Sequence, residues 1–124
     1  MPSQQAALAS NLTVIASELD TLYNAAGQPQ SIANLRNQIL QASNDLAALD
    51  IDTLLNDPTD LAKVQQLTTA INGAAGKIAA DQAKVTAVVN FCTSLVNMVG
   101  DFATGNVLGG IGLVSTAIGQ VKTL

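Results

Sequence analysis

The spacing of the apolar residues constrains the fold most, because it follows the period of an α-helix along almost all of the 124 residues. In residues 3–26 and again in residues 31–49, apolar side chains recur at steps of three and four. This spacing places them in one stripe along a helix, whereas a half-buried strand alternates every second residue. The pattern therefore predicts an all-α protein, an amphipathic bundle of about four helices forming a single domain, 1–124.

The first two helices are expected to form an antiparallel hairpin within residues 1–56. Residues 27–29, Gly-Gln-Pro, stop the first helix, and Ser31 is placed to cap the second. A connection this short joins antiparallel neighbours, so the two apolar stripes should face each other. Asn11 and Glu18 lie seven residues apart on another face of the first helix, which we expect to be solvated.

A third helix is expected to begin at an acidic junction. Asp57-Pro58-Thr59-Asp60 combines an N-cap residue, a proline at the first helical position and an acid in the first turn. Asp50 and Asp52 add to the acidic character of this junction, and Asn56 adds a neutral polar side chain. A calcium-binding EF-hand loop would need regularly spaced ligands, a glycine at the sixth position and a glutamate at the twelfth. That spacing is absent, so the acids indicate helix capping and not a metal site.

The apolar stripe keeps its phase from this junction to Val99, which predicts one long helix over 57–101. The small residues Gly73–Gly76 would then mark a bend or a close crossing of two backbones. The alternative is that Asn72-Gly73 ends one helix and opens a turn. Lys77, Asp81 and Lys84 have the spacing of ordinary ion pairs on a helix surface.

The composition excludes several classes of function. The chain has no histidine, which removes Ser-His-Asp and Cys-His catalysis and histidine-based metal sites. We therefore expect no enzyme activity, no metal and no cofactor, and the net charge of −4 disfavours nucleic acid as a partner. Cys92 lies among valines and leucines and is expected to be a buried, inert thiol. The first residues show no secretory signal, which leaves a cytoplasmic location or export by a non-standard route open.

The C-terminal third differs from the rest of the chain in charge. Residues 1–84 contain eight acids and four bases, whereas residues 85–124 contain only Asp101 and Lys122. The last helix, expected over 105–124, is apolar and rich in glycine, and Gly105 begins a GxxxG spacing of the kind that allows close helix packing in membranes.

Three surroundings are compatible with this segment. The stretch 102–121 has about the length that crosses a bilayer, ~20 residues. Its polar content favours conditional over permanent insertion into the membrane. Asp101 would then lie at the tip of a helical hairpin. Alternatively, the last helix is the fully buried central helix of the bundle. Because the two N-terminal stripes are narrow, we expect that they cannot cover it and that lipid, a second copy or a partner subunit does. The residues expected to make this contact are Val88, Phe91, Leu95, Val99, Phe102, Leu108, Gly109, Ile111, Leu113, Val114 and Ile118.

Residues 77–100, KIAADQAKVTAVVNFCTSLVNMVG, followed by residues 106–119, NVLGGIGLVSTAIG, form the most informative part of the sequence. Over roughly residues 60–121 this arrangement resembles the α-helical pore-forming toxins in architecture, although their chains are usually much longer. The resemblance implies a soluble helical form that inserts its hairpin into a membrane on oligomerising.

Three functions are compatible with these observations. The first is a membrane-active helical protein whose C-terminal hairpin contacts lipid. The second is a self-assembling structural subunit, in which the same residues join copies of the chain or a partner helical subunit. The third is a carrier that holds a small apolar ligand in a cavity inside the bundle, which the scarcity of aromatic residues disfavours.

Overall fold

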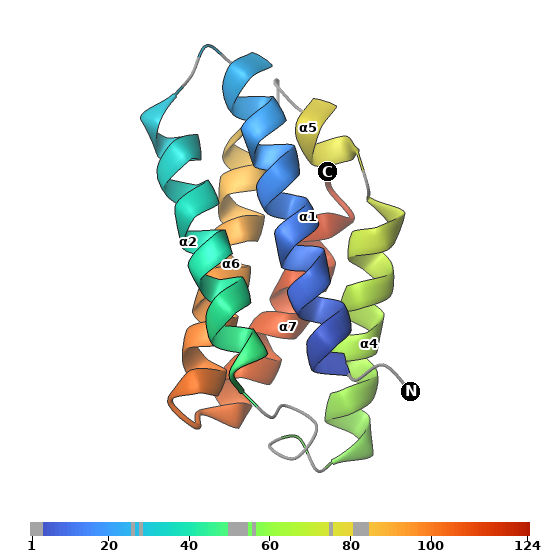
Figure 1. Cartoon of the computed structure of the whole chain (residues 1–124). Helices are drawn as coiled ribbons and strands as arrows, with labels where there is room; N and C mark the ends of the chain where they lie inside the picture. Colours follow the sequence, from blue (N-terminus) through green and yellow to red (C-terminus); the bar gives the residue numbers. More distant parts are fainter. Residues whose placement is uncertain are drawn as a thin grey trace.

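The computed structural model describes residues 4–25, 27, 29–49, 55, 57–74, 76–80 and 85–124. These residues form six helices packed against each other and contain no strand, which confirms the all-α bundle (Figure 1). The helices are α1 (Gln4–Ala25), α2 (Gln30–Ala47), α4 (Pro58–Gly73), α5 (Lys77–Ala80), α6 (Val85–Ala103) and α7 (Val107–Val121).

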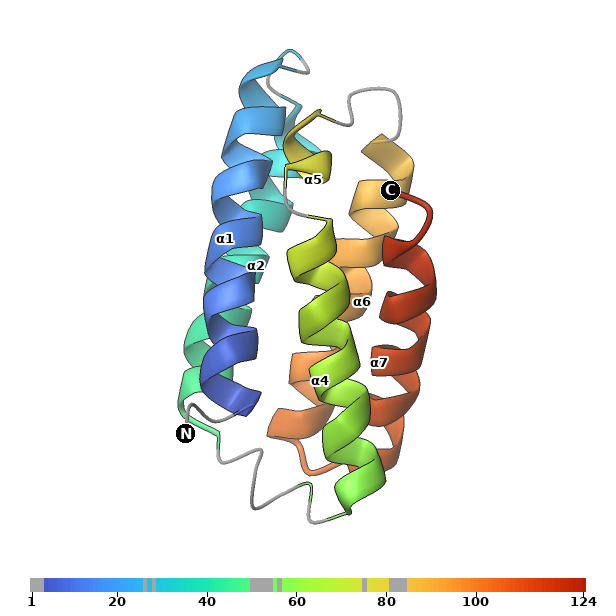
Figure 2. The same ribbon diagram turned by 90° about the vertical axis from the view of Figure 1, so that its right-hand side faces the viewer.

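The helices pack in a closed arrangement in which each long helix has two long neighbours. α1 and α2 form the expected N-terminal hairpin, α2 packs on α6, α6 on α7, α7 on α4, and α4 returns to α1 (Figures 1 and 2). The short α5 also packs on α1. The apolar stripes of α1 and α2 are buried in the shared core, which contains Leu8, Leu12, Ile15, Leu19 and Leu22 from α1 and Ile32, Leu35, Ile39, Ala42 and Leu46 from α2.

The helix starts follow local chemistry. The Asp57 side chain accepts a hydrogen bond of 2.9 Å from the N–H of Thr59, and Pro58 occupies the first helical position of α4, as the sequence predicts. The prediction of Ser31 as the cap of α2 is wrong, because the helix begins at Gln30 and Pro29 is the N-cap, in an extended conformation. Asp50, Asp52 and Asn56 lie outside the described residues.

The prediction of one long helix over 57–101 is wrong, and the alternative of a turn after Asn72 is correct. α4 ends at Gly73, where the N–H of Ala74 donates to the carbonyl oxygens of Ala70 and Ile71. Gly76 then adopts φ +84°, a left-handed conformation that glycine takes without strain. The break lets the apolar stripe of α4 face α1 and α7, while the stripe of α6 faces α2 and α7. The expected ion pairs of Asp81 with Lys77 and Lys84 depend on residues 81–84, which lie outside the described residues.

The expectation that Asn11 and Glu18 face solvent is also wrong. Asn11 is buried, and its Nδ2 donates to the carbonyl oxygen of Thr68 on α4 at 3.4 Å. Glu18 is half-buried, and its carboxylate accepts a hydrogen bond from the N–H of Gly76. Both residues face α4 and its following turn, because α1 has neighbours on two sides and not only at α2.

Candidate functional site: the C-terminal helical hairpin

The hairpin formed by α6 and α7 is closed by a tight turn. Gly105 in this turn has φ +82°, and the N–H of Asn106 donates to the carbonyl oxygen of Asp101 at 2.8 Å. The side chain of Asn106 then caps α7 by accepting a hydrogen bond of 3.1 Å from the N–H of Gly109. The turn therefore fixes the two helices to each other through hydrogen bonds of its own.

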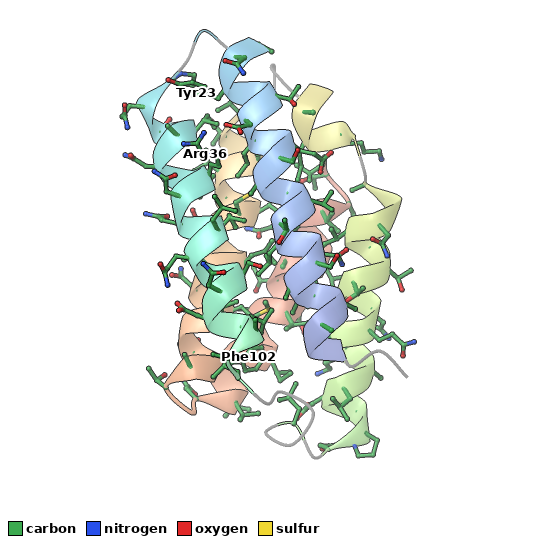
Figure 3. The ribbon with its side chains drawn as sticks, in the orientation of Figure 1. Tyr23, Arg36 and Phe102 are labelled. Carbon is green, nitrogen blue, oxygen red and sulfur yellow. The ribbon has the colours of Figure 1, made fainter. Side chains whose placement is uncertain are left out.

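Two glycines at the start of α7 allow the helices to approach closely. A Cβ added at Gly110 would lie 2.4 Å from Cε1 of Phe102, whose ring is buried at the lower end of the bundle in Figure 3. A Cβ added at Gly109 would lie 2.5 Å from Nδ2 of Asn106 and 2.9 Å from Oδ2 of Asp101. The GxxxG spacing of Gly105 and Gly109 thus belongs to a turn within one chain.

The structure divides the predicted contact residues between the core and the surface. Neighbouring helices of the same chain cover part of these residues, since α2 packs on α6 and α4 packs on α7. Leu108 is 87% exposed, and Gly109, Leu113 and Ile118 are half-buried. The buried members are Val88, Phe91, Leu95, Val99, Phe102, Ile111 and Val114.

α7 is not a fully buried central helix. It lies at the edge of the bundle, between α4 and α6 (Figure 2), and its outer face is exposed. That outer face carries no charge and consists of Leu108, Gly112, Ser115, Thr116 and Gly119.

The continuous span expected over 102–121 is interrupted, because the turn at residues 104–106 separates the two helices. Among the described helices, α6 is long and apolar enough to cross a membrane by length and composition, and 44% of it is buried inside the bundle. Core helices of soluble proteins meet the same criterion. α7, with 15 residues, is about 22 Å long, which is less than the ~30 Å of a bilayer's hydrocarbon core.

The described helices are held together by two kinds of contact. Among the described residues, hydrogen bonds and an ion pair join α1 to its neighbours. Thr13 and Ala9 bond to Ser43 of α2, Asp20 pairs with Arg36 of α2, Asn11 bonds to Thr68 of α4, and Glu18 bonds to Gly76. Within the described part of the chain, α6 and α7 pack on α2 and α4 through apolar side chains. Sequence patterns did not reveal this division, since the polar partners are up to 58 residues apart.

No protein family, curated protein or solved structure matches this chain.

Two titratable groups near the hairpin have raised pKa values, Cys92 and Glu18. Burial, and secondarily the negative charge of Glu18, raises the pKa of the Cys92 thiol to about 12. Cys92 is fully buried and free, as the sequence predicts, and a thiol with this pKa is unreactive at neutral pH. Partial burial raises the pKa of Glu18, opposed by the hydrogen bond from Gly76. The described residues contain no group of three metal-ligating side chains.

A groove of about 480 Å³ lies on the outside of the bundle, where α4 and α7 pack against each other. The carrier interpretation placed its cavity inside the bundle, whereas this groove is open to the outside and is lined by both polar and apolar side chains. Its lining residues are Ala62, Gln65, Gln66, Thr69, Ala70, Ile118 and Lys122.

Proposed function

We propose that this protein is a non-catalytic, membrane-active helical protein that places its α6–α7 hairpin in lipid. The observation that carries the proposal is the division of contacts described above. α1 is tied to its neighbours by hydrogen bonds and an ion pair, whereas α6 and α7 meet α2 and α4 through apolar surface.

The physical argument concerns what is lost when the hairpin leaves the bundle. Two of these hydrogen bonds, those of Asn11 and Ser43, are part-buried, and breaking them in an apolar medium would leave polar groups unpaired at a cost in free energy. Moving an apolar helix face from contact with protein to contact with lipid has no comparable cost in free energy, because lipid tails and the protein core are similarly apolar. The charge distribution agrees, since Asp101 is the single charged residue between 85 and 121 and lies beside the turn.

The helix lengths favour shallow insertion. α6, with 19 residues, is about 28 Å long, and α7 is shorter. A hairpin of this length with a charged tip lies better in the membrane interface, with its apolar faces in the acyl chains, than across the bilayer. The exposed polar residues of α6, Thr86, Asn90, Thr93 and Asn97, would then remain in the headgroup region.

Locking the hairpin in the bundle tests this proposal. Ala70 of α4 and Ile118 of α7 line the same groove, so the double variant Ala70→Cys/Ile118→Cys can be joined by a bifunctional maleimide. Buried Cys92 should not react. The matched control is Thr13→Cys/Ser43→Cys, whose parent hydroxyl oxygens lie 3.2 Å apart, and which locks α1 to α2 while leaving the hairpin free.

Flotation with phosphatidylcholine vesicles is the measurement, combined with light scattering. Three proteins are expected to float: the wild type, the Thr13→Cys/Ser43→Cys control with its two cysteines joined, and the Ala70→Cys/Ile118→Cys protein carrying a monofunctional maleimide. The Ala70→Cys/Ile118→Cys protein joined by the bifunctional maleimide should stay in solution. Flotation of the bridged protein would show that separation of the hairpin is not needed, and absence of flotation by the wild type would refute membrane binding itself.

Self-assembly is a second candidate, favoured by the outer face of α7. Leu108 is 87% exposed, and small residues along this face permit close packing of another helix. In that case light scattering gives an oligomer without vesicles, and Leu108→Asn dissociates it.

A further inference from the structure

Acidic residues gather at the end of the bundle where the hairpin turns. The last turn of α2, the start of α4 and the last turn of α6 all lie at this end, which is the lower end in Figures 1 and 2. They carry Asp45, Asp57, Asp60 and Asp101, and we call these four residues the tip acids. The base near this end is Lys63, in the second turn of α4.

The other described bases lie away from the tip. Arg36 is in the first half of α2 and pairs with Asp20, Lys77 begins α5, and Lys122 follows the last residue of α7. Helix α5 and the C-terminus lie at the end opposite to the turn (Figure 1). Of the described residues, a membrane approached tip first therefore meets four carboxylates and one ammonium group.

We infer that the lipid surface this hairpin enters is electroneutral, a zwitterionic headgroup layer and not an anionic one. This inference rests on the proposed function and specifies its lipid class. Interfacial helices that bind anionic lipid carry Lys and Arg on their polar face, whereas the polar face of α6 carries Thr86, Asn90, Thr93 and Asn97 and has no base. The attraction must come from apolar burial alone, and the tip acids oppose any negative surface.

The size of the effect follows from the surface potential. At about −30 mV, typical of a leaflet containing anionic lipid, each carboxylate at the surface is disfavoured roughly threefold. Three net negative charges among the described tip residues, four acids less Lys63, then give roughly thirtyfold weaker binding than to a neutral bilayer. The discrimination should shrink as salt is raised, because screening shortens the Debye length to ~3 Å at ~1 M salt.

The experiment compares binding to phosphatidylcholine vesicles with binding to vesicles containing roughly a third phosphatidylserine, at low and high salt. The tip variant is Asp60→Asn/Asp101→Asn. Its matched control, Glu18→Gln/Asp20→Asn, removes two acids from the C-terminal half of α1, away from the tip. Both variants therefore change the net charge from −4 to −2. Circular dichroism establishes that both variants remain helical. For each variant, binding to neutral vesicles is divided by binding to anionic vesicles, so a change in hairpin opening that affects both measurements equally cancels.

We expect the wild type and the control variant to favour neutral vesicles roughly thirtyfold, and the tip variant to lose most of this preference. Equal or stronger binding to anionic vesicles by the wild type would overturn the inference while leaving membrane binding intact. A control variant that changes as much as the tip variant would overturn the tip-first orientation. Absence of binding to every vesicle would instead refute the proposed function.

Discussion

Replacing Gly110 with alanine adds one methyl group at the contact between α7 and the ring of Phe102. The added Cβ would lie 2.4 Å from Cε1, 2.6 Å from Cδ1 and 2.9 Å from Cζ of this ring. Phe102 is 1% exposed, so the ring has no open space to move into. We therefore expect the hairpin to separate locally or the ring to leave its preferred rotamer.

Two effects of opposite sign determine the change in the free energy of unfolding. Alanine favours a helix interior over glycine by ~1 kcal/mol, whereas overpacking a core typically costs ~1–3 kcal/mol. A contact of 2.4 Å with an enclosed ring belongs in the upper part of that range, which gives a net loss of ~1–2 kcal/mol. Gly112 is the matched control, because it is exposed in the same helix and a Cβ there meets no atom within 4 Å. Gly112→Ala should gain up to ~1 kcal/mol.

Thermal and urea unfolding followed by circular dichroism measure both changes. For a domain of this size we expect about 3–5 °C in Tm per kcal/mol, with Gly110→Ala below the wild type and Gly112→Ala above it. Adding Phe102→Leu to Gly110→Ala should recover part of the loss, as coupling between two residues in contact. If Gly110→Ala is as stable as Gly112→Ala, the close packing of Phe102 on α7 is wrong.

Three further predictions concern single side chains. Because the pKa of Glu18 is raised, the native state binds its proton more readily than the unfolded state, so stability should rise as pH falls through that pKa toward 4.5; Glu18→Gln should flatten this part of the pH–stability profile and raise stability at pH 7. Cys92, with its pKa raised to about 12, should resist an aromatic disulfide reagent at pH 8 and react once neutral vesicles open the hairpin; equal reaction rates with and without vesicles would contradict opening. Asp57→Ala should cost ~1 kcal/mol in urea unfolding through the lost hydrogen bond to Thr59, and Asp57→Asn much less.

Part of the candidate site was predictable from the sequence. The low charge of residues 85–121 and the position of Asp101 beside a turn are properties of the sequence alone. The roles of Gly109 and Gly110 were not, because they depend on which side chains the neighbouring helix presents. The tip acids lie at the same end of the bundle because of how α2, α4 and α6 are arranged, and the residue spacing within any one helix does not predict this.

Features that depend on neighbours three or four residues away follow from the sequence alone. These are the helices with their buried stripes, the cap at Asp57 and the all-α class of the described residues. What each remaining helix face contacts depends on tertiary packing. Asn11 and Glu18 have the spacing of a solvated face and yet contact α4 and Gly76. The apolar pattern of the sequence continues across Gly73, yet helix α4 ends there. Helical periodicity records which residues share a face, and only packing between distant segments determines whether water, a backbone group or another helix covers that face.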